Sequence, residues 1–379
     1  MKLIIDTDPG TDDAVAILIA LAHFTNDEIL GITTVAGNVK VDVGTRNALR
    51  ILEHAGRNEI PVFEGEAEPL ERELETAEWV HGTDGLNFVP FPEPSKEAEG
   101  SGAVEFLRDT LENSDERITL AVLGPMTNIG KLIRDFPNTK NKIEKIVFMG
   151  GGAGMGNHTP VAEFNILVDP EAADIVLSSG VPLVMMGLDV THQAISTKER
   201  IERIVATGSE TGKLLSGLLG SLLDIEIVKQ KFPDGTPVHD AFVTAYLVDN
   251  TLTTGEVVNV EVETESKLTI GQTVVDVNNI SGRHPNVHWM NKVDDEKCIE
   301  LYHQLHFKEA NECFEKNGKN GIMIFTGSRG PFYRGAVLLE LERYQDAIDW
   351  FDQALKFEKS EEILYHKGLA FSYLGKHDD

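Results

Sequence analysis

The first fifteen residues constrain the fold and the chemistry of this chain more than any other stretch. The apolar run Leu3-Ile4-Ile5 predicts a buried strand, Pro9-Gly10 predicts a turn, and residues 14–22 predict an apolar helix. Four carboxylates crowd the end of this strand and the start of this helix: Asp6, Asp8, Asp12 and Asp13. Open α/β sheets bind their ligands at the carboxyl ends of strands, so this stretch is a candidate ligand site.

The four like charges need compensation. Helix capping can account for one or two of the aspartates, but no Lys or Arg occurs between Lys2 and Lys40. Because neighbouring carboxylates repel each other unless a cation or a shared proton relieves them, we expect a divalent cation with hard oxygen ligands, Ca²⁺ or Mg²⁺. Capping plus solvated charge is the simpler alternative.

Apolar strands alternate with helices over the first 300 residues. Strands are predicted at these positions: 29–36, 61–63, 118–123, 145–149, 183–189, 257–262, 269–275 and 286–289. A long polar loop, residues 65–101, interrupts the pattern. The alternation predicts an α/β fold with a mainly parallel central sheet flanked by helices.

The composition restricts the partners and the compartment. A formal net charge of −28 argues against a nucleic-acid polymer or an anionic membrane surface. No apolar run reaches the ~18–20 residues of a membrane span. Only two cysteines occur, Cys298 and Cys313, and no charged-then-apolar leader precedes the strand at Leu3. We therefore expect a cytoplasmic protein without a signal peptide.

Two later stretches carry polar side chains suited to a ligand. The glycine-rich run 150–156 fits neither a dinucleotide fingerprint nor a phosphate loop. It leads to Asn157, Glu163 and Asn165, a combination that suits vicinal sugar hydroxyls. A polar surface loop is the alternative. Further along, His239-Asp240 precedes an apolar helix and is either a helix cap or a proton donor beside a metal ligand.

In chain order, these stretches resemble the inosine–uridine nucleoside hydrolase family over residues 1 to about 300. The motifs that carry the resemblance are Asp6-Thr-Asp8-Pro-Gly-Thr-Asp12-Asp13, Gly37-Asn38, His81-Gly-Thr-Asp84-Gly-Leu86, Gly124-Pro-Met-Thr127-Asn128, Met149-Gly-Gly-Gly, Ala162-Glu163-Phe164-Asn165 and Val238-His239-Asp240. The resemblance implies a sheet of nucleoside-hydrolase type, a bound Ca²⁺, and hydrolysis of the N-glycosidic bond of ribonucleosides in purine or pyrimidine salvage.

The resemblance also implies a role for each matching position. The implied calcium ligands are Asp8, Asp13, Asp240 and the carbonyl of Thr127. Asp8 is also the implied general base, and His239 the implied aid to departure of the base. The implied substrate-binding residues are Asp12, Asn38, His81, Met149, Asn157, Glu163 and Asn165. Asp6 is expected to contact the residues that bind the metal or the substrate without binding either of them itself.

This assignment suits the chemistry of N-glycosidic bond cleavage. Because breaking a ribosyl–base bond builds positive charge on the sugar, a carboxylate-rich pocket stabilises the transition state. Such a pocket also repels a 5′-phosphate, which favours nucleosides over nucleotides. The stretch 222–233 contains no Tyr or His that could assist the base. The purine or pyrimidine preference therefore stays open.

The sequence changes character after residue 305. Arg334-Gly-Ala-Val recurs 33 residues later as Lys367-Gly-Leu-Ala, and 307–314 parallels 344–351, a period that resembles tetratricopeptide repeats. We expect a hydrolase domain at 1–305 and a small, incomplete, all-α repeat-like segment at 306–379 that could bind a protein partner. We also expect a homo-oligomer, a dimer or a tetramer.

Two other functions fit parts of the sequence. One is a repeat-based binding scaffold that carries a degenerate hydrolase domain. The other is a haloacid-dehalogenase-like phosphatase, which also has Asp-x-Asp after its first strand. The joint presence of the implied sugar ligands argues against the first alternative. Against the second, no obvious later Lys motif for phosphate occurs in the sequence.

Overall fold

The computed structural model describes residues 1–206, 210–295, 297–298, 335, 338–339, 343–355 and 361–375. The chain folds into two compact units. The first unit comprises Met1–Arg203 and Lys213–Leu301, and the second comprises Ile204–Gly212 and Tyr302–Asp379. The predicted half-repeat at 307–314 lies outside the described residues.

An eight-stranded sheet forms the centre of the first unit, in the order β3-β2-β1-β4-β5-β6-β12-β9. In that order the strands are Val62–Glu64, Ile29–Thr34, Leu3–Thr7, Ile118–Val122, Ile143–Met149, Leu183–Met186, Val287–Val293 and Thr253–Val258. Every neighbouring pair is parallel except β12 with β9. The prediction of a mainly parallel sheet is confirmed.

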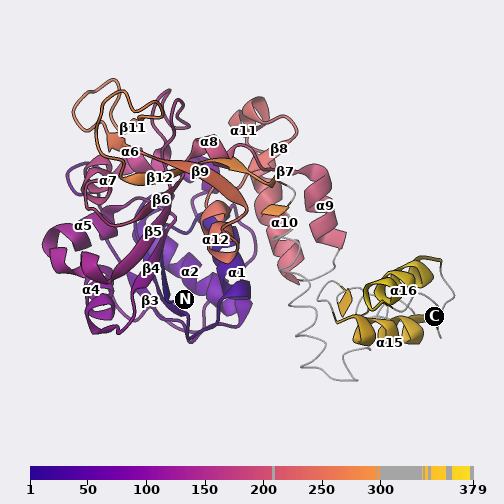
Figure 1. Cartoon of the computed structure of the whole chain (residues 1–379). Coiled ribbons are helices and arrows are strands. Elements are labelled where there is room, and N and C mark those ends of the chain that lie inside the picture. Colours follow the sequence, from indigo (N-terminus) through magenta and orange to yellow (C-terminus); the bar gives the residue numbers. More distant parts are fainter. Residues whose placement is uncertain are drawn as a thin grey trace. The chain divides into compact units, whose positions relative to one another are not determined.

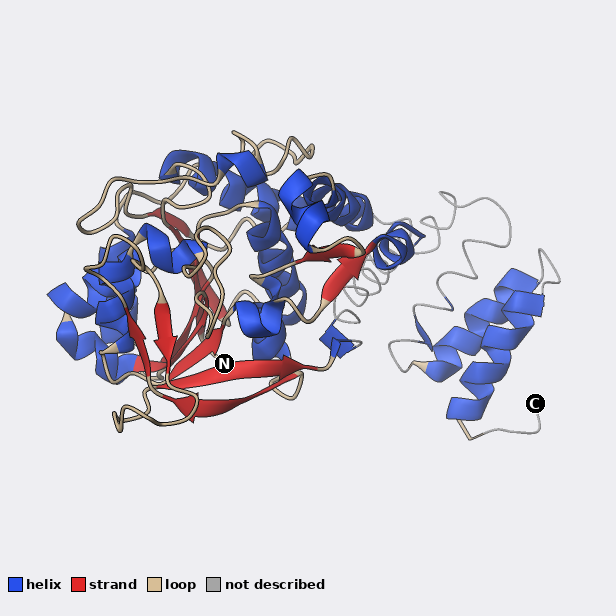
Figure 2. Cartoon of the chain, turned by 90° about the horizontal axis from the view of Figure 1, so that it is seen from above, coloured by secondary structure: helices blue, strands red, loops and turns tan. Residues whose placement is uncertain are grey.

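Helices cover both faces of this sheet (Figure 1, Figure 2). On one face α1 (Thr11–His23) packs against α2 (Val41–Ala55) and α12 (Ala241–Val248). On the other, α5 (Thr127–Asp135) packs against α4 (Ala103–Asn113) and α7 (Pro170–Leu177). Residues 11–21 of α1 are all buried, which explains why this helix reads as uniformly apolar instead of amphipathic.

The strand order places the acidic loop at a special point. The chain runs outward from β1 to β2 and β3, then returns to place β4 on the other side of β1. Crevices in open α/β sheets lie outside the carboxyl ends of the strands where the order reverses in this way. The loop after β1 therefore opens at the natural ligand position of the fold.

The remaining elements before residue 300 are short or peripheral. The helices are α3 (Glu78–His81), η1 (Pro137–Lys142), α6 (Phe164–Val168), α8 (Leu188–Thr191), α9 (Lys198–Ala206), α10 (Glu210–Leu223) and α11 (Glu226–Lys231). The small strands pair as β7 (Ile195–Thr197) with β8 (Gly235–Pro237), and as β10 (Val260–Val262) with β11 (Thr273–Val275).

Several predicted strands are wrong in extent; the strand predicted at 269–275, for example, begins only at Thr273. The predicted strand 257–262 is two strands, because β9 ends at Val258 and pairs with β12 while β10 pairs with β11. The predicted strand 183–189 ends at Met186, since Gly187 starts the short helix α8. An apolar run alone does not reveal where a strand changes partner or ends.

The described residues of the second unit near the C-terminus form α15 (Tyr344–Leu355) and α16 (Glu361–Tyr373), which pack together. Ala347, Phe351 and Ala354 of α15 are buried with Ile363 and Ala370 of α16. This helical pair agrees with the all-α prediction. The relationship to tetratricopeptide repeats stays a prediction. Across the described parts of the chain, no helix is long and apolar enough to cross a membrane.

Candidate active site

The carboxylate of Asp8 lies fully buried at the carboxyl end of β1. Its Oδ2 accepts a hydrogen bond from the backbone of Asn38 at 2.7 Å, whereas its Oδ1 has no partner among the described residues. Gly37 and Gly124 leave room for it, because a Cβ on either would lie 2.2 Å from an Asp8 oxygen. A buried carboxylate oxygen without a partner is costly unless a ligand or a proton satisfies it.

Asp13 is held in place from several sides. Its Oδ1 accepts from Thr7 Oγ1 at 2.5 Å. Its Oδ2 accepts from the Gly10 backbone and from Asn38 Nδ2, both at 3.0 Å. Asn38 thus contacts both Asp8 and Asp13, which places this predicted substrate-binding residue inside the acidic cluster.

Three carboxylates converge on one point at the start of α1 and α12. One oxygen each of Asp12, Asp13 and Asp240 lies within 4.8 Å of the others, and all three residues are buried. Burial raises the pKa of each of them, and the charges of Asp12 and Asp13 raise the pKa of Asp240 further. Oxygen ligands of this kind suit a hard divalent cation.

Asp8 shares this electrostatic environment although it is not one of those three. Burial and then the charge of Asp13 raise its pKa well above the ordinary value. Burial also raises the pKa of Asp12, and hydrogen bonding with Asp240 and with the backbone of His239 offsets part of that effect.

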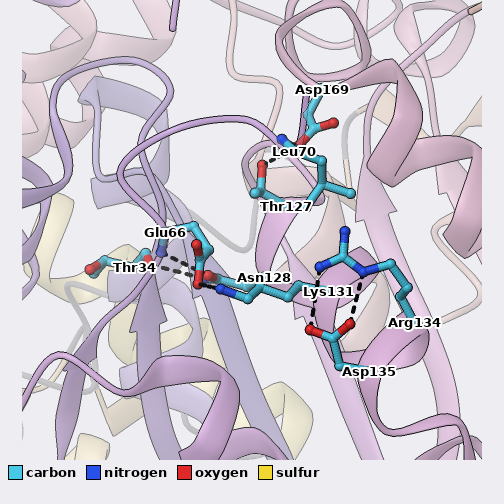
Figure 3. A network of polar contacts seen from close by, with 9 residues as sticks. All are labelled: Thr34, Glu66, Leu70, Thr127, Asn128, Lys131, Arg134, Asp135 and Asp169. Atoms are coloured by element: carbon cyan, nitrogen blue, oxygen red, sulfur yellow. Dashed lines mark hydrogen bonds and ion pairs between the residues drawn. The ribbon is translucent and has the colours of Figure 1, made fainter. Parts of the chain in front are cut away.

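The first two residues of α5, Thr127 and Asn128, make buried hydrogen bonds, and Figure 3 shows them with Asp169 and Thr34 among their partners. Thr127 Oγ1 donates to Asp169 Oδ2 at 2.8 Å. Asn128 Nδ2 donates to Asp6 Oδ1 at 2.7 Å and to the Thr34 carbonyl at 2.9 Å. Burial raises the pKa of Asp6 to about 7. Sequence reasoning missed Asp169, since Asp169-Pro170 reads as an ordinary helix cap.

Glu163 and Asn165 are fixed at the start of α6. Glu163 caps this helix, accepting from the backbone of Asn165 at 3.0 Å and of Gly151 at 3.0 Å. Burial raises its pKa to about 7. Asn165 Nδ2 donates to the Leu123 carbonyl at 2.7 Å and the Met149 carbonyl at 3.2 Å. Asn157 is exposed, and its Oδ1 accepts from the Phe164 backbone at 2.9 Å.

Two histidines approach the same pocket. The Thr11 backbone donates to His81 Nδ1 at 3.1 Å, so the proton of the neutral ring lies on Nε2. Burial lowers the pKa of His81 to about 4. The Nδ1 of His239 lies 2.8 Å from Thr191 Oγ1, and burial lowers the pKa of His239 well below its usual value. Both rings are therefore neutral at neutral pH.

A single pocket brings all of the predicted substrate-binding residues together. Its lining includes all seven of them, Asp12, Asn38, His81, Met149, Asn157, Glu163 and Asn165, together with His239 and Asp240. The other predicted metal residues, Asp8, Asp13 and Thr127, are buried and are not part of that lining.

The sequence analysis did not predict several residues that line the pocket. They are Trp79, Leu222, Ile227, Val228, Lys231 and Phe232. The available signal was the spacing of Ile227, Val228 and Lys231, which is that of one helix face. No motif marks these residues as functional.

The profile of the inosine-uridine preferring nucleoside hydrolase family matches residues 3–300. This chain belongs to that family. A pyrimidine-specific ribonucleoside hydrolase RihA from Shewanella sp. (strain MR-7) is 43% identical over 303 residues, covering 79% of this chain and 94% of the relative.

Solved structures of the family resemble the chain as well. A purine-preferring ribonucleoside hydrolase from Gardnerella vaginalis gives a TM-score of 0.75 at 32% identity, covering 82% of this chain and 98% of the other. An inosine-guanosine nucleoside hydrolase gives 0.72 at 29% identity, covering 80% and 98%. The predicted family and the prediction of an enzyme of the nucleoside hydrolase class are confirmed.

Proposed function

We propose that this chain hydrolyses the N-glycosidic bond of ribonucleosides, releasing ribose and the free base, with Ca²⁺ bound at the acidic cluster. The observation that carries the proposal is the convergence of buried Asp12, Asp13 and Asp240 beside the unpartnered Oδ1 of Asp8. Clustered carboxylates of this kind, buried together at one point, fit a divalent metal.

Asp8, Asp13, Asp240 and the backbone carbonyl of Thr127 would hold the metal. Asp8 is proposed as a ligand because its buried Oδ1 has no partner among the described residues. The hydroxyl of Thr127 already donates a hydrogen bond to Asp169, so the backbone carbonyl is the Thr127 oxygen that we assign to the metal. When bound, the ion would orient the ribose hydroxyls and lower the pKa of a water molecule.

The side chains of the protein carry the remaining steps. Asp8 takes a proton from the attacking water, whose hydroxyl adds to C1′ while the C1′–N electron pair passes to the base. Asp12, Asn157, Glu163 and Asn165 accept or donate hydrogen bonds at the ribose. The negative charge of the pocket stabilises the positive charge that develops on the sugar ring.

Departure of the base needs hydrogen-bond donors in the part of the pocket that holds the base. The neutral ring of His239 lies in the pocket lining, and His81 presents Nε2–H because its Nδ1 accepts from Thr11. We assign His239 to assist the departing base and His81 to bind near it.

We also propose four further properties of this protein. They are a cytoplasmic location, a homo-oligomer (dimer or tetramer), a role in purine or pyrimidine salvage, and a protein partner for residues 306–379. The location rests on the low cysteine content. The oligomer and the salvage role rest on the family resemblance, and the protein partner rests on the repeat-like sequence.

The decisive test measures reducing sugar released from inosine and uridine, with and without a chelator. We expect release from at least one nucleoside, loss with chelator, and recovery with added Ca²⁺. Asp8→Asn should lower kcat at least ~100-fold, as expected for loss of a general base. Phosphate release from phosphomonoesters without ribose release from any nucleoside would overturn the proposal.

A further inference from the structure

One cation lies in the lining of this otherwise acidic pocket. Helix α11 contributes Ile227, Val228 and Lys231 to the lining, and Phe232 follows directly. The Nζ of Lys231 lies 5.7 Å from the centre of the Phe232 ring. Across the residues that the structure describes, Lys231 forms no ion pair, whereas Lys229 of the same helix pairs with Asp224 at 3.4 Å.

Lys231 shares the pocket lining with two imidazoles, those of His192 and His239. His192 and His239 have ring centres 5.4 Å apart, and the ring of His192 meets Phe232 edge-on at 4.9 Å. Burial first, and then the positive charge of Lys231, lowers the pKa of His192 to about 4. Among the described residues that line the pocket, Lys231 is the one lysine or arginine.

The pocket lining therefore carries charged groups of both signs. Asp12 and Glu163 supply carboxylates and Lys231 supplies an ammonium, in a lining that also includes His192 and His239. As the C1′–N bond breaks, the sugar becomes positive and the base takes the electron pair. A carboxylate near the sugar and an ammonium near the base would each stabilise one part of this separated charge.

We propose that Lys231 is a further residue of the leaving-base site, where its ammonium donates a hydrogen bond to a carbonyl oxygen of the departing base. This inference rests on the proposed function. The attacking water supplies the hydroxyl to C1′ and the proton that finally neutralises the base, so Lys231 remains an ammonium throughout. Its contribution is to stabilise negative charge on the base.

The chemistry of an ammonium sets a preference among substrates. Lysine offers three donors and no acceptor, so it favours a base edge with carbonyl oxygens and disfavours one with an amino group. Bases with a carbonyl in place of the exocyclic amino group, such as uracil and hypoxanthine, fit this site better than cytosine and adenine. The ratio of kcat/KM for uridine to that for cytidine therefore reports on Lys231.

The test compares Lys231→Met with Lys229→Met, a control that removes a positive charge from the same helix but not from the pocket lining. Both variants are assayed as full-length, Ca²⁺-loaded protein on uridine, cytidine and p-nitrophenyl β-D-ribofuranoside. The nitrophenolate ion leaves without assistance, so its release does not depend on a donor. Lys231→Arg is added because it keeps the charge.

We expect Lys231→Met to lower kcat for uridine on the order of tenfold, the usual effect of losing a charge-assisted hydrogen bond. The uridine-to-cytidine ratio should fall, nitrophenyl riboside cleavage should stay within about twofold of wild type, and Lys231→Arg should recover part of the uridine activity. Equal losses on all three substrates, or no loss, would overturn the inference alone. A wild-type enzyme inactive on every riboside would overturn the proposed function itself.

Discussion

At the scale of single residues, the Asp8 carboxylate fits in its position because its neighbours Gly37 and Gly124 have no side chain. Gly124 follows β4 at the reversal point of the sheet, and a Cβ there would meet Asp8 Oδ1 at 2.2 Å and Cγ at 2.6 Å. No flexible side chain stands between them, so the carboxylate itself has to move. Metal binding and activity should therefore be sensitive to one added methyl group.

Gly124→Ala should lower ribose release by about 100-fold or more, because small displacements of a reacting group are costly. Calcium affinity, measured by titration calorimetry, should fall in parallel. Gly154→Ala is the matched control, since no described atom lies within 4 Å of a Cβ at Gly154. Wild-type activity in Gly124→Ala would show that Asp8 does not need its present position.

The site residues that could be predicted from the sequence are those that follow an apolar strand or a glycine-rich turn. Asp8 follows an apolar strand and Glu163 follows a glycine-rich turn, so their types and places were informative. Lys231 and Trp79 were not predicted, because their contribution depends on where α11 and the long loop run in three dimensions. Lys231 also stands in a polar stretch where a charged side chain is unremarkable.

At the scale of elements, the β10–β11 hairpin holds the glycine-rich loop beside Glu163. Thr273 of β11 is buried, and its Oγ1 donates to the Gly152 carbonyl at 2.7 Å and accepts from the Gly152 backbone at 2.8 Å. The neighbouring Gly151 donates to Glu163. One hydroxyl thus links an outlying hairpin to the proposed ribose site.

Thr273→Val should destabilise the protein by roughly 2–4 kcal/mol, since it leaves two buried backbone groups unsatisfied. Thr253→Val is the control: Thr253 is also buried, but its Oγ1 has no partner among the described residues. Urea unfolding followed by circular dichroism would measure both. Equal effects of the two substitutions would contradict a specific role for the Thr273 hydroxyl.

Strand and helix alternation predicted the architecture because each buried parallel strand is a continuous apolar run. The β10–β11 pairing could not be predicted with the same certainty. Val260 to Val262 read as a continuation of the preceding strand, and only the tertiary structure separates β9, which joins the main sheet, from β10.

At the scale of the whole molecule, stability should depend on metal and pH together. Burial raises the pKa of Glu163 from 4.5 to about 7, so the folded state binds more protons than the unfolded state between these values. The resulting stabilisation is present below about pH 4.5 and is lost as the pH rises through 7. The carboxylates of the acidic cluster shift in the same direction.

Metal-free protein should therefore unfold at a lower temperature at pH 7.5 than at pH 5.5. Calcium at about 100 times its Kd should add roughly 2.7 kcal/mol of stability, with a larger rise in Tm at the higher pH. Scanning calorimetry with chelator and with Ca²⁺ measures both effects. An unchanged Tm on calcium addition at pH 7.5 would contradict a structural contribution from the ion.

The assembly of the acidic cluster from distant parts of the chain has a consequence for biosynthesis. The acidic cluster combines Asp12 and Asp13 from the first helix with Asp240 at the start of α12, so most of the hydrolase unit separates its members along the chain. A ribosome-bound nascent chain carries the first aspartates long before the last one emerges. The proposed metal site therefore cannot be complete until nearly the whole hydrolase unit has been translated.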